Sequence, residues 1–155
     1  MEGPRAVRAS ELDELMALVN GVFRAGGGRM RECFPTLFCE ENLDNVRLIK
    51  EDGRIVSHIG VCVRDVISQG VRFTVGNVGA VCTHEDYRKR GHAEALLRHF
   101  NAKLRGDGVD LLFVSGDRTL YRRHGCARVG KVSQDRKSTR LNSSHIQKSR
   151  MPSSA

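Results

Sequence analysis

Residues 86–97, DYRKRGHAEALL, combine a cationic turn with the start of a helical pattern. Arg88, Lys89 and Arg90 precede Gly91, and apolar residues follow at helical spacing. The first turn of a helix leaves backbone N–H groups without partners and carries the positive end of the helix dipole. Basic residues beside it therefore predict a site for a dense anion. The alternative is a solvated charged turn that begins an ordinary helix.

Composition and cysteine spacing exclude several classes of partner and site. Tryptophan is absent and aromatic residues make up 5% of the chain, which argues against a stacking platform for nucleic acid. No segment is apolar and long enough to span a membrane, so we expect no membrane partner. The low aromatic content leads us to expect no nucleic-acid partner either. The cysteines form no CxxC pair, and their odd number favours reduced thiols in a cytoplasmic protein without a metal site. They stand at positions 33, 39, 62, 82 and 126.

Residues 135–155 differ in character from the rest of the chain. Their sequence, DRKSTRLNSSHIQKSRMPSSA, resembles translated sequencing-adapter DNA and holds few apolar residues. We therefore expect one domain at 1–134 followed by a disordered, non-native tail. The alternative is a basic tail that binds nucleic acid. The formal net charge is +8, but residues 1–134 carry only +4 once the tail's five basic residues and one aspartate are left out.

The elements before the cationic turn predict an α+β chain. Residues 4–9 are a strand candidate, and Ser10, with Asp13 three residues later, is typical of a helix N-cap. Apolar residues at spacings of three and four predict an amphipathic helix over 12–23. Residues 29–45, with a proline and a mixed pattern, indicate a loop or a broken second helix.

The long stretch before the turn reads as a sheet. Val, Ile and Thr dominate residues 46–83, and two turn signals divide them into three antiparallel strands. Gly76 and Gly79, in the third strand, predict a bulge or the close approach of another group. After the turn we expect a helix with one apolar face (Ala93, Leu96, Leu97, Phe100, Leu104), a buried central strand at 109–115, a short helical turn at 118–125 and the beginning of a strand at 126–132.

Three segments in this order resemble the GNAT superfamily of acetyl-CoA-dependent N-acetyltransferases. The family's signature, Q/R-x-x-G-x-G/A, reads RKRGHA at residues 88–93. VGAVCTHEDYRKRGHAEALL is similar to the family's strand, acidic-aromatic turn, cationic loop and helix. LYRRHGCARVG is similar to its FY-x-x-x-GF element, with Cys126 where an aromatic residue is usual. The resemblance covers residues 5–132 and implies a mixed, mostly antiparallel central sheet flanked by helices.

The resemblance implies a site for acetyl-CoA as co-substrate. The pyrophosphate would lie against the loop and helix start formed by Arg88, Lys89, Arg90, Gly91, His92 and Ala93. Pantetheine would pair with the backbone at the end of the preceding strand, as a further strand would. The residues implied there are Val81, Cys82 and Thr83. In the alternative interpretation, these three residues simply pair with the strand at 109–115.

The resemblance also implies that Tyr121 is the general acid that protonates the departing coenzyme A thiolate. The alternative is a tyrosine that packs its ring on the core with its hydroxyl at the surface. The general base stays open, because the third strand offers Asn77 and no carboxylate. Asp117 is expected to cap a short helix. Candidate bases near in sequence are His84, Glu85, Asp86, His92 and His124.

The implied activity is direct transfer of an acetyl group to a primary amine of a small molecule or peptide. The resemblance also leaves a homodimer open. Two other classes are a catalytically silent acyl-CoA-binding module and a basic nucleic-acid-binding domain. Family domains continue with two closing strands, whereas the native sequence here is expected to end near Gln134. We therefore expect an exposed sheet edge and an incomplete acceptor wall.

Overall fold

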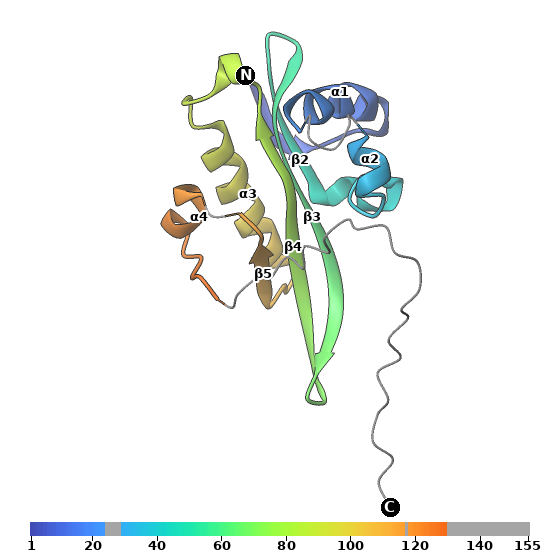
Figure 1. Ribbon diagram of the computed structural model, residues 1–155, viewed down its shortest axis with the longest axis vertical. Helices are drawn as coiled ribbons and strands as arrows, with labels where there is room; N and C mark the ends of the chain where they lie inside the picture. The colour runs from blue at the N-terminus through green and yellow to red at the C-terminus, as the bar shows by residue number, and fades with distance from the viewer. Residues whose placement is uncertain (24–28, 117, 130–155) are drawn as a thin grey trace, which may run out of the picture.

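The computed structural model describes residues 1–23, 29–116 and 118–129. They form a five-stranded sheet in the order β1-β2-β3-β4-β5 with helices on both faces (Figure 1). All neighbouring strands are antiparallel except β4 and β5, which are parallel. This mixed, mostly antiparallel sheet confirms the predicted α+β fold class. The strands are β1 (Glu2–Ala6), β2 (Val46–Glu51), β3 (Arg54–Ser68), β4 (Val71–Thr83) and β5 (Leu111–Val114).

Helices α1 and α2 lie on one side of the sheet, and α3 and α4 on the other (Figure 1). The predicted break in the region 29–45 is confirmed, because the short helix α2 and the 3₁₀ helix η3 share it. Among the described helices, none is long and apolar enough to cross a membrane. The bounds are α1 (Leu12–Val22), α2 (Met30–Cys33), α3 (His92–Gly106) and α4 (Thr119–Arg123), with 3₁₀ helices η1 (Ala9–Glu11), η3 (Glu40–Asn45) and η4 (Glu85–Tyr87).

The start of α1 differs from the prediction. Ser10 lies inside η1 rather than at an N-cap, and α1 begins one residue after Glu11. The Glu11 carboxylate accepts two hydrogen bonds of 2.7 Å from the Arg5 guanidinium and one of 3.0 Å from the backbone N–H of Arg8. Charge-assisted bonds of this kind are stronger than a hydroxyl cap, so the contact between Glu11 and β1 sets this turn instead.

The predicted meander of β2, β3 and β4 is confirmed, and β4 carries the predicted bulge. Gly60 pairs with Gly79 while His58, two residues earlier, pairs with Cys82, three residues later. One extra residue therefore stands in β4, and Ala80 adopts a φ of 52° there. A bulge bends its strand and interrupts the ladder, which changes the direction of the strand end that leads to the cationic turn.

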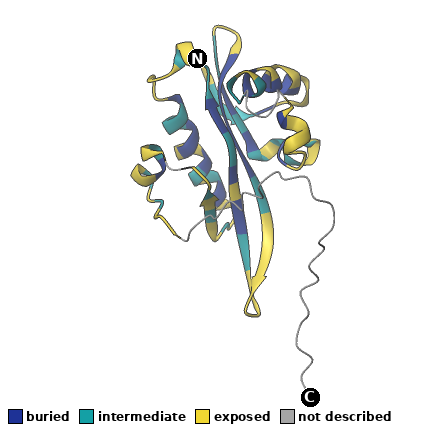
Figure 2. Ribbon diagram, in the orientation of Figure 1, coloured by how far each residue is buried: buried dark blue, intermediate teal, exposed yellow. Residues whose placement is uncertain are grey.

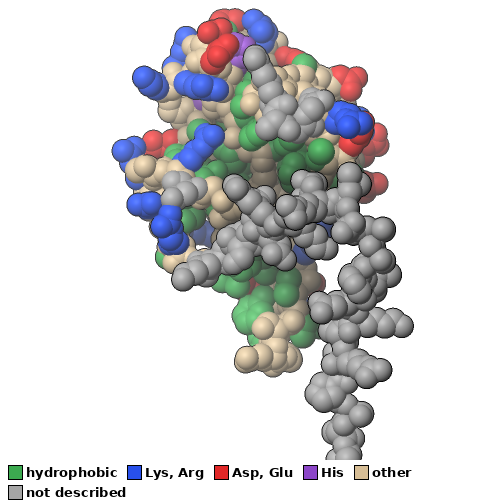
Figure 3. All heavy atoms as spheres, viewed as in Figure 1, with side chains coloured by type: hydrophobic (Ala, Val, Ile, Leu, Met, Phe, Trp, Pro, Cys, Tyr) green, Lys and Arg blue, Asp and Glu red, His purple; other side chains and the backbone are tan. Residues whose placement is uncertain are grey.

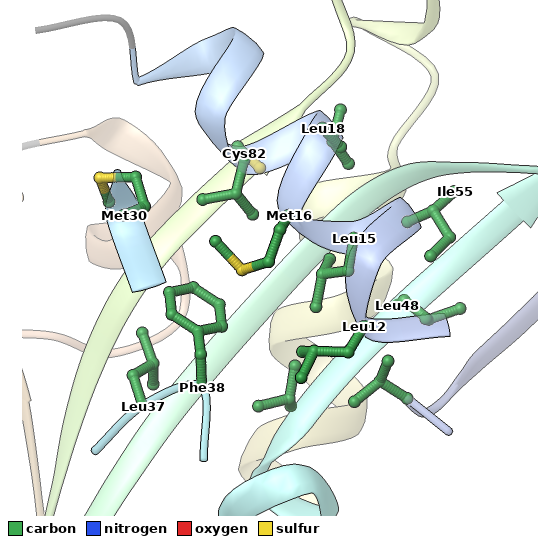
Figure 4. Close-up of a cluster of buried hydrophobic side chains, with 13 residues drawn as sticks. Leu12, Leu15, Met16, Leu18, Met30, Leu37, Phe38, Leu48, Ile55 and Cys82 are labelled. Carbon is green, nitrogen blue, oxygen red and sulfur yellow. The ribbon is translucent and has the colours of Figure 1, made fainter. Parts of the chain in front are cut away.

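Two apolar clusters form the core, one on each side of the sheet. The first packs α1 and the segment after α2 on the strands, with Leu15, Val19 and Phe38 completely buried (Figure 4). The second packs α3 on the opposite face through Leu96 and Phe100, as its apolar face predicts. Figure 2 shows the buried residues concentrated where helices cover the sheet.

The expectation of a buried central strand at 109–115 is wrong. In the described residues β5 has one neighbour, β4, and the side chains of Leu111 and Phe113 are 47% and 48% exposed. Residues 126–129 are not in a strand, and 130–132 lie outside the described residues, as does the expected tail at 135–155. An apolar run is buried only where neighbours cover both of its faces, which the pattern alone does not guarantee.

The outer end of the β3–β4 hairpin is also exposed. It extends past the helices (Figure 1), and hydrophobic side chains are visible on it in Figure 3. The exposed apolar residues here are Val66, Ile67 and Val71. The helices therefore cover only the upper part of the sheet in Figure 1, where β4 ends and α3 begins.

Candidate active site

A cleft of about 470 Å³ lies between the end of β4, the start of α3 and the start of α4. Eight of the nine residues predicted to bind the cofactor line it, and Arg90 is the exception. The structure thus brings together two segments that the sequence analysis assigned separately, the strand end and the cationic loop. The eight residues are Val81, Cys82, Thr83, Arg88, Lys89, Gly91, His92 and Ala93.

The loop into α3 has an unusual backbone. Lys89 and Gly91 both have positive φ, 64° and 82°, and Gly91 is the N-cap of α3 without a side-chain cap. A Cβ added at Gly91 would meet no atom within 4 Å, so open space faces this residue. The first-turn N–H groups of this 15-residue helix have no intrahelical acceptors. The cleft therefore has donors and a positive dipole end aimed into open space, which fits an anion.

The side chains around the cleft add positive charge. Arg88, Lys89 and Arg118 line it, and the Arg88 Nε donates to the carbonyl of Thr83 over 3.3 Å. Glu94 is the one acid among the lining residues, and its carboxylate accepts from Arg98 over 3.1 Å. The net field in the cleft therefore favours a polyanion such as a pyrophosphate.

Arg90 turns away from the cleft. Its guanidinium lies 3.2 Å from Oε2 of Glu51, donates to the carbonyl of Asp86 over 3.0 Å and sits 4.7 Å from the centre of the Tyr87 ring. Nε2 of the buried His92 lies 3.3 Å from the other oxygen of Glu51, which is within ion-pair distance. The two atoms do not form a hydrogen bond. Two of the predicted residues thus contact β2.

Among the described residues, the end of β4 has no strand partner on its β5 side. The parallel ladder runs from Val75 opposite Leu111 to Val78 opposite Val114 and reaches no further along β4. The alternative in which Val81 to Thr83 pair with the strand at 109–115 is therefore wrong. The side chains of Val81 and Cys82 are buried, so the backbone of this edge is the part that faces the cleft. An unpaired strand edge offers N–H and C=O groups to an extended ligand.

Cys82 lies in the cleft wall but is not a nucleophile at neutral pH. Burial raises the pKa of its thiol to about 12, against the weaker opposing effect of nearby Arg118 and Arg88. Since the thiolate is the reactive form of cysteine, Cys82 is inert in the folded protein.

Tyr121 lies in α4 behind the cleft. Its ring is buried in the α3-side core with 7% of its surface exposed, and it does not line the cleft, whereas its neighbours Arg118 and Leu120 do. Burial raises the pKa of its hydroxyl, and the nearby charge of Arg118 opposes that effect. The phenol is therefore protonated throughout the neutral range, as a general acid must be.

The candidate bases are dispersed. His84 and Glu85 line a neighbouring cleft of about 480 Å³ beside α1, and Nδ1 of His84 accepts from the backbone N–H of Asp86 over 3.3 Å. Asn77 is exposed in the middle of β4, far along the strand from the loop. Of the candidate bases, only His92 lines the 470 Å³ cleft. Asp117, the expected helix cap, lies outside the described residues, and Arg118 is the N-cap of α4.

Sequence reasoning missed part of the cleft wall. Val22, at the end of α1, and Tyr87, in η4, both line the cleft, as do Arg118 and Leu120. Arg118 stands three residues before Tyr121, so its basic character was a usable signal, whereas Val22 is one apolar residue among many and gave none. In the part of the chain that the structure describes, no three metal-ligating side chains come together.

In the described residues, a bulged mixed sheet thus brings an unpaired strand end against a cationic helix N-terminus. The family model of the acetyltransferase (GNAT) domain matches residues 4–129, and the chain belongs to this family. The resemblance seen in the sequence is thereby confirmed, and membership supports acetyl transfer as the general chemistry. A comparison with curated proteins gave no significant match.

Solved structures share the fold. A GNAT family acetyltransferase from Brucella melitensis in complex with acetyl-CoA is 24% identical, with a TM-score of 0.64 over 78% of this chain and 79% of that chain. Glucosamine-6-phosphate N-acetyltransferase from Arabidopsis thaliana is 12% identical, with a TM-score of 0.66 over 86% and 97%. A GCN5-related N-acetyltransferase from Ralstonia eutropha is 18% identical, with a TM-score of 0.65 over 84% and 95%. At these identities the likeness shows the fold alone.

Proposed function

We propose that this protein transfers the acetyl group of acetyl-CoA to a primary amine of a small molecule or peptide. The observation that carries the proposal is the single cleft in which the unpaired end of β4 meets the cationic N-terminus of α3. A strand edge suits an extended amide-bearing arm, and a helix N-terminus suits a pyrophosphate. Coenzyme A joins these two chemical groups in one molecule.

In this proposal the first-turn N–H groups of α3, together with Arg88 and Lys89, hold the pyrophosphate. The backbone of Val81 to Thr83 pairs with pantetheine, which directs the thioester toward the bulge in β4. Arg118 supplies a further cation from the opposite wall of the cleft. The positive φ of Gly91 and the open space before it support this arrangement, because a ligand approaches the backbone there without meeting a side chain.

The transfer step needs no covalent enzyme intermediate. The lone pair of a neutral amine forms a bond with the thioester carbonyl carbon, the carbon–sulfur bond breaks, and the electron pair leaves with sulfur. The Tyr121 hydroxyl gives its proton to that thiolate, and the proton lost by the amine passes to a base that we do not assign. The raised pKa of Cys82 supports direct transfer, since the one thiol in the cleft wall is protonated.

A second candidate is a silent acyl-CoA-binding module. It is favoured by one observation: Tyr121 is buried and does not line the cleft. The two candidates share the cofactor site and differ only in the chemical step. Acetyl transfer by the wild type therefore separates them, because only an enzyme has a rate, and Tyr121→Phe then tests whether this residue takes part in the step.

The first experiment is a calorimetric titration of the full chain with acetyl-CoA. We expect a dissociation constant of about 1–100 μM for the wild type and at least tenfold weaker binding for Arg88→Ala. Arg105→Ala is the matched control, because it removes an exposed arginine near the other end of α3. A folded wild-type chain that does not bind acetyl-CoA would refute the proposal. Binding would justify a screen of amine acceptors.

A further inference from the structure

Glu51, the last residue of β2, contacts the cofactor loop from outside the cleft. Its carboxylate lies 3.2 Å from Nη1 of Arg90 and 3.3 Å from Nε2 of His92. The next residue, Asp52, accepts a hydrogen bond from the Tyr87 hydroxyl over 3.4 Å. The β2–β3 turn thus contacts residues on both sides of the loop. Glu51 and Arg90 are 39 positions apart in sequence.

Arg90 is held in one orientation by three different contacts. The Glu51 carboxylate and the Asp86 carbonyl accept from its guanidinium, and the Tyr87 ring lies against it. A planar guanidinium bound in this way is not available to a phosphate in the cleft. Among the four residues from Arg88 to Gly91, only Arg90 is absent from the cleft wall.

The loop needs such support. Lys89 and Gly91, which flank Arg90, both have positive φ, and a non-glycine residue such as Lys89 keeps that strained conformation only when surrounding contacts hold it. His92 begins α3 with its side chain 4% exposed beside Glu51, so the same carboxylate also contacts the first turn of the helix. One residue of β2 therefore reaches both the loop and the helix start.

We propose that Glu51 is a positioning residue for acyl-CoA binding, which holds the loop through Arg90 and His92, and that Arg90 acts through this contact rather than as a ligand of the pyrophosphate. The inference rests on the proposed function for the identity of the ligand. It assigns to Glu51 and Arg90 a role that the family signature alone does not give, since Arg90 stands at an unspecified position of Q/R-x-x-G-x-G/A.

The sign of one effect tests the proposal. Glu51 places a negative charge near an anion site, so on Coulomb's law alone Glu51→Gln would strengthen coenzyme A binding. If Arg90 bound the phosphate directly, loss of its competing carboxylate would also strengthen binding or leave it unchanged. A positioning role predicts the opposite, a loss of affinity of about three- to tenfold.

The experiment is a calorimetric titration of the full chain with coenzyme A for the wild type, Glu51→Gln, Arg90→Gln and the double variant. We expect each single variant to bind coenzyme A more weakly than the wild type. The double variant should lose no more affinity than the weaker-binding single variant, because both substitutions remove the same contact. Glu40→Gln is the control, because it removes an exposed glutamate of η3. Unchanged or tighter binding by Glu51→Gln, or additive losses, would overturn the proposal.

Amide hydrogen exchange in the ligand-free protein separates this inference from the proposed function. We expect faster exchange at residues 88–95 in Glu51→Gln and unchanged exchange in α1. If the wild type failed to bind coenzyme A while this exchange difference appeared, the proposed function would fail and the role of Glu51 in holding the loop would stand. Equal exchange in both proteins would overturn the role of Glu51 whether or not the ligand binds.

Discussion

The Tyr121 ring lies directly against the backbone of Gly116, so that a Cβ added at Gly116 would stand 2.9 Å from Cε2 of the ring. Gly116 follows β5, and Tyr121 lies in α4, so this contact fixes the short helix against the strand end. The position of the proposed general acid thus depends on a residue without a side chain. Gly116 is exposed, whereas the ring belongs to the α3-side core, so the ring cannot move without disturbing that core.

Gly116→Ala is therefore expected to displace the Tyr121 ring. The overpacked methyl group should lower the free energy of unfolding by about 1–3 kcal/mol. Thermal and urea unfolding measure this loss. Ser115→Ala, at the exposed preceding residue, is the control and should leave stability within about 0.5 kcal/mol of the wild type. Equal stability of Gly116→Ala and Ser115→Ala would show that the ring relaxes freely.

Tyr121→Phe is expected to lower kcat by about 100-fold and to leave KM for acetyl-CoA unchanged. The reason is that in the proposed mechanism the hydroxyl acts on the leaving thiolate, while the residue itself does not line the cleft at the start of α3. Steady-state measurement of coenzyme A release, with an amine found in the acceptor screen, gives both constants. Because burial raises the pKa of this phenol, the wild-type rate should show no loss from its ionisation in the neutral range. An unchanged kcat would remove Tyr121 from the mechanism.

Gly91→Ala tests the backbone of the cofactor loop. At a φ of 82° an alanine costs about 1–2 kcal/mol, although open space would accept its methyl group. We expect lower affinity for acetyl-CoA together with a small loss of stability, both measurable on one preparation by calorimetry and thermal unfolding. Gly106→Ala, at the other end of α3, also places a methyl group in open space and has no positive φ, so it should preserve both quantities.

The ion pair of Arg5 and Glu11, before the start of α1, should make the free energy of unfolding depend on pH in the acid range. Hydrogen bonds from Arg5 lower the pKa of Glu11 from 4.5 to about 2, against the opposing effect of burial. The folded state thus favours the carboxylate, and this contribution is complete above about pH 4.5 and is lost as the pH falls toward 2.

Glu11→Gln should therefore be less stable than the wild type by about 1–3 kcal/mol at pH 7, and the difference should shrink between pH 4.5 and 2. Urea unfolding at a series of pH values measures it. Glu40→Gln, on the exposed surface of η3, should show no such convergence. A difference that stays constant across this range would mean that the ionised carboxylate is not the stabilising form.

Cys82 should be chemically silent despite its place in the cleft wall. With a pKa of about 12, its thiol is protonated at pH 7.5, so iodoacetamide should modify the exposed Cys33 and leave Cys82 unmodified. Mass spectrometry of the digested protein identifies the labelled residue. The same measurement after incubation with acetyl-CoA should find no acetyl group on Cys82. An acetylated Cys82 would contradict direct transfer to the amine.

Local patterns predicted the meander and α3, because each depends on residues close together in sequence. The two-residue turns at Asp52–Gly53 and Gln69–Gly70 have the positive φ values that such turns need. The start of α1 was not predictable in the same way. Ser10 has the right spacing for a cap, but Glu11 is bound by Arg5 from the neighbouring strand.

The cleft likewise combines features that local sequence predicts with features that depend on long-range contacts. The loop could be predicted from residues 88–104 alone, because its basic residues, its glycine and the apolar face of the helix are close together in sequence. Contacts between distant elements select the cations that face the cleft, because a carboxylate of β2 holds Arg90 outside it while Arg118, at the start of α4, lines it. The tertiary structure also decided that β5 stops short of the end of β4. Long-range contacts decide such outcomes, and the spacing of residues along the chain does not record them.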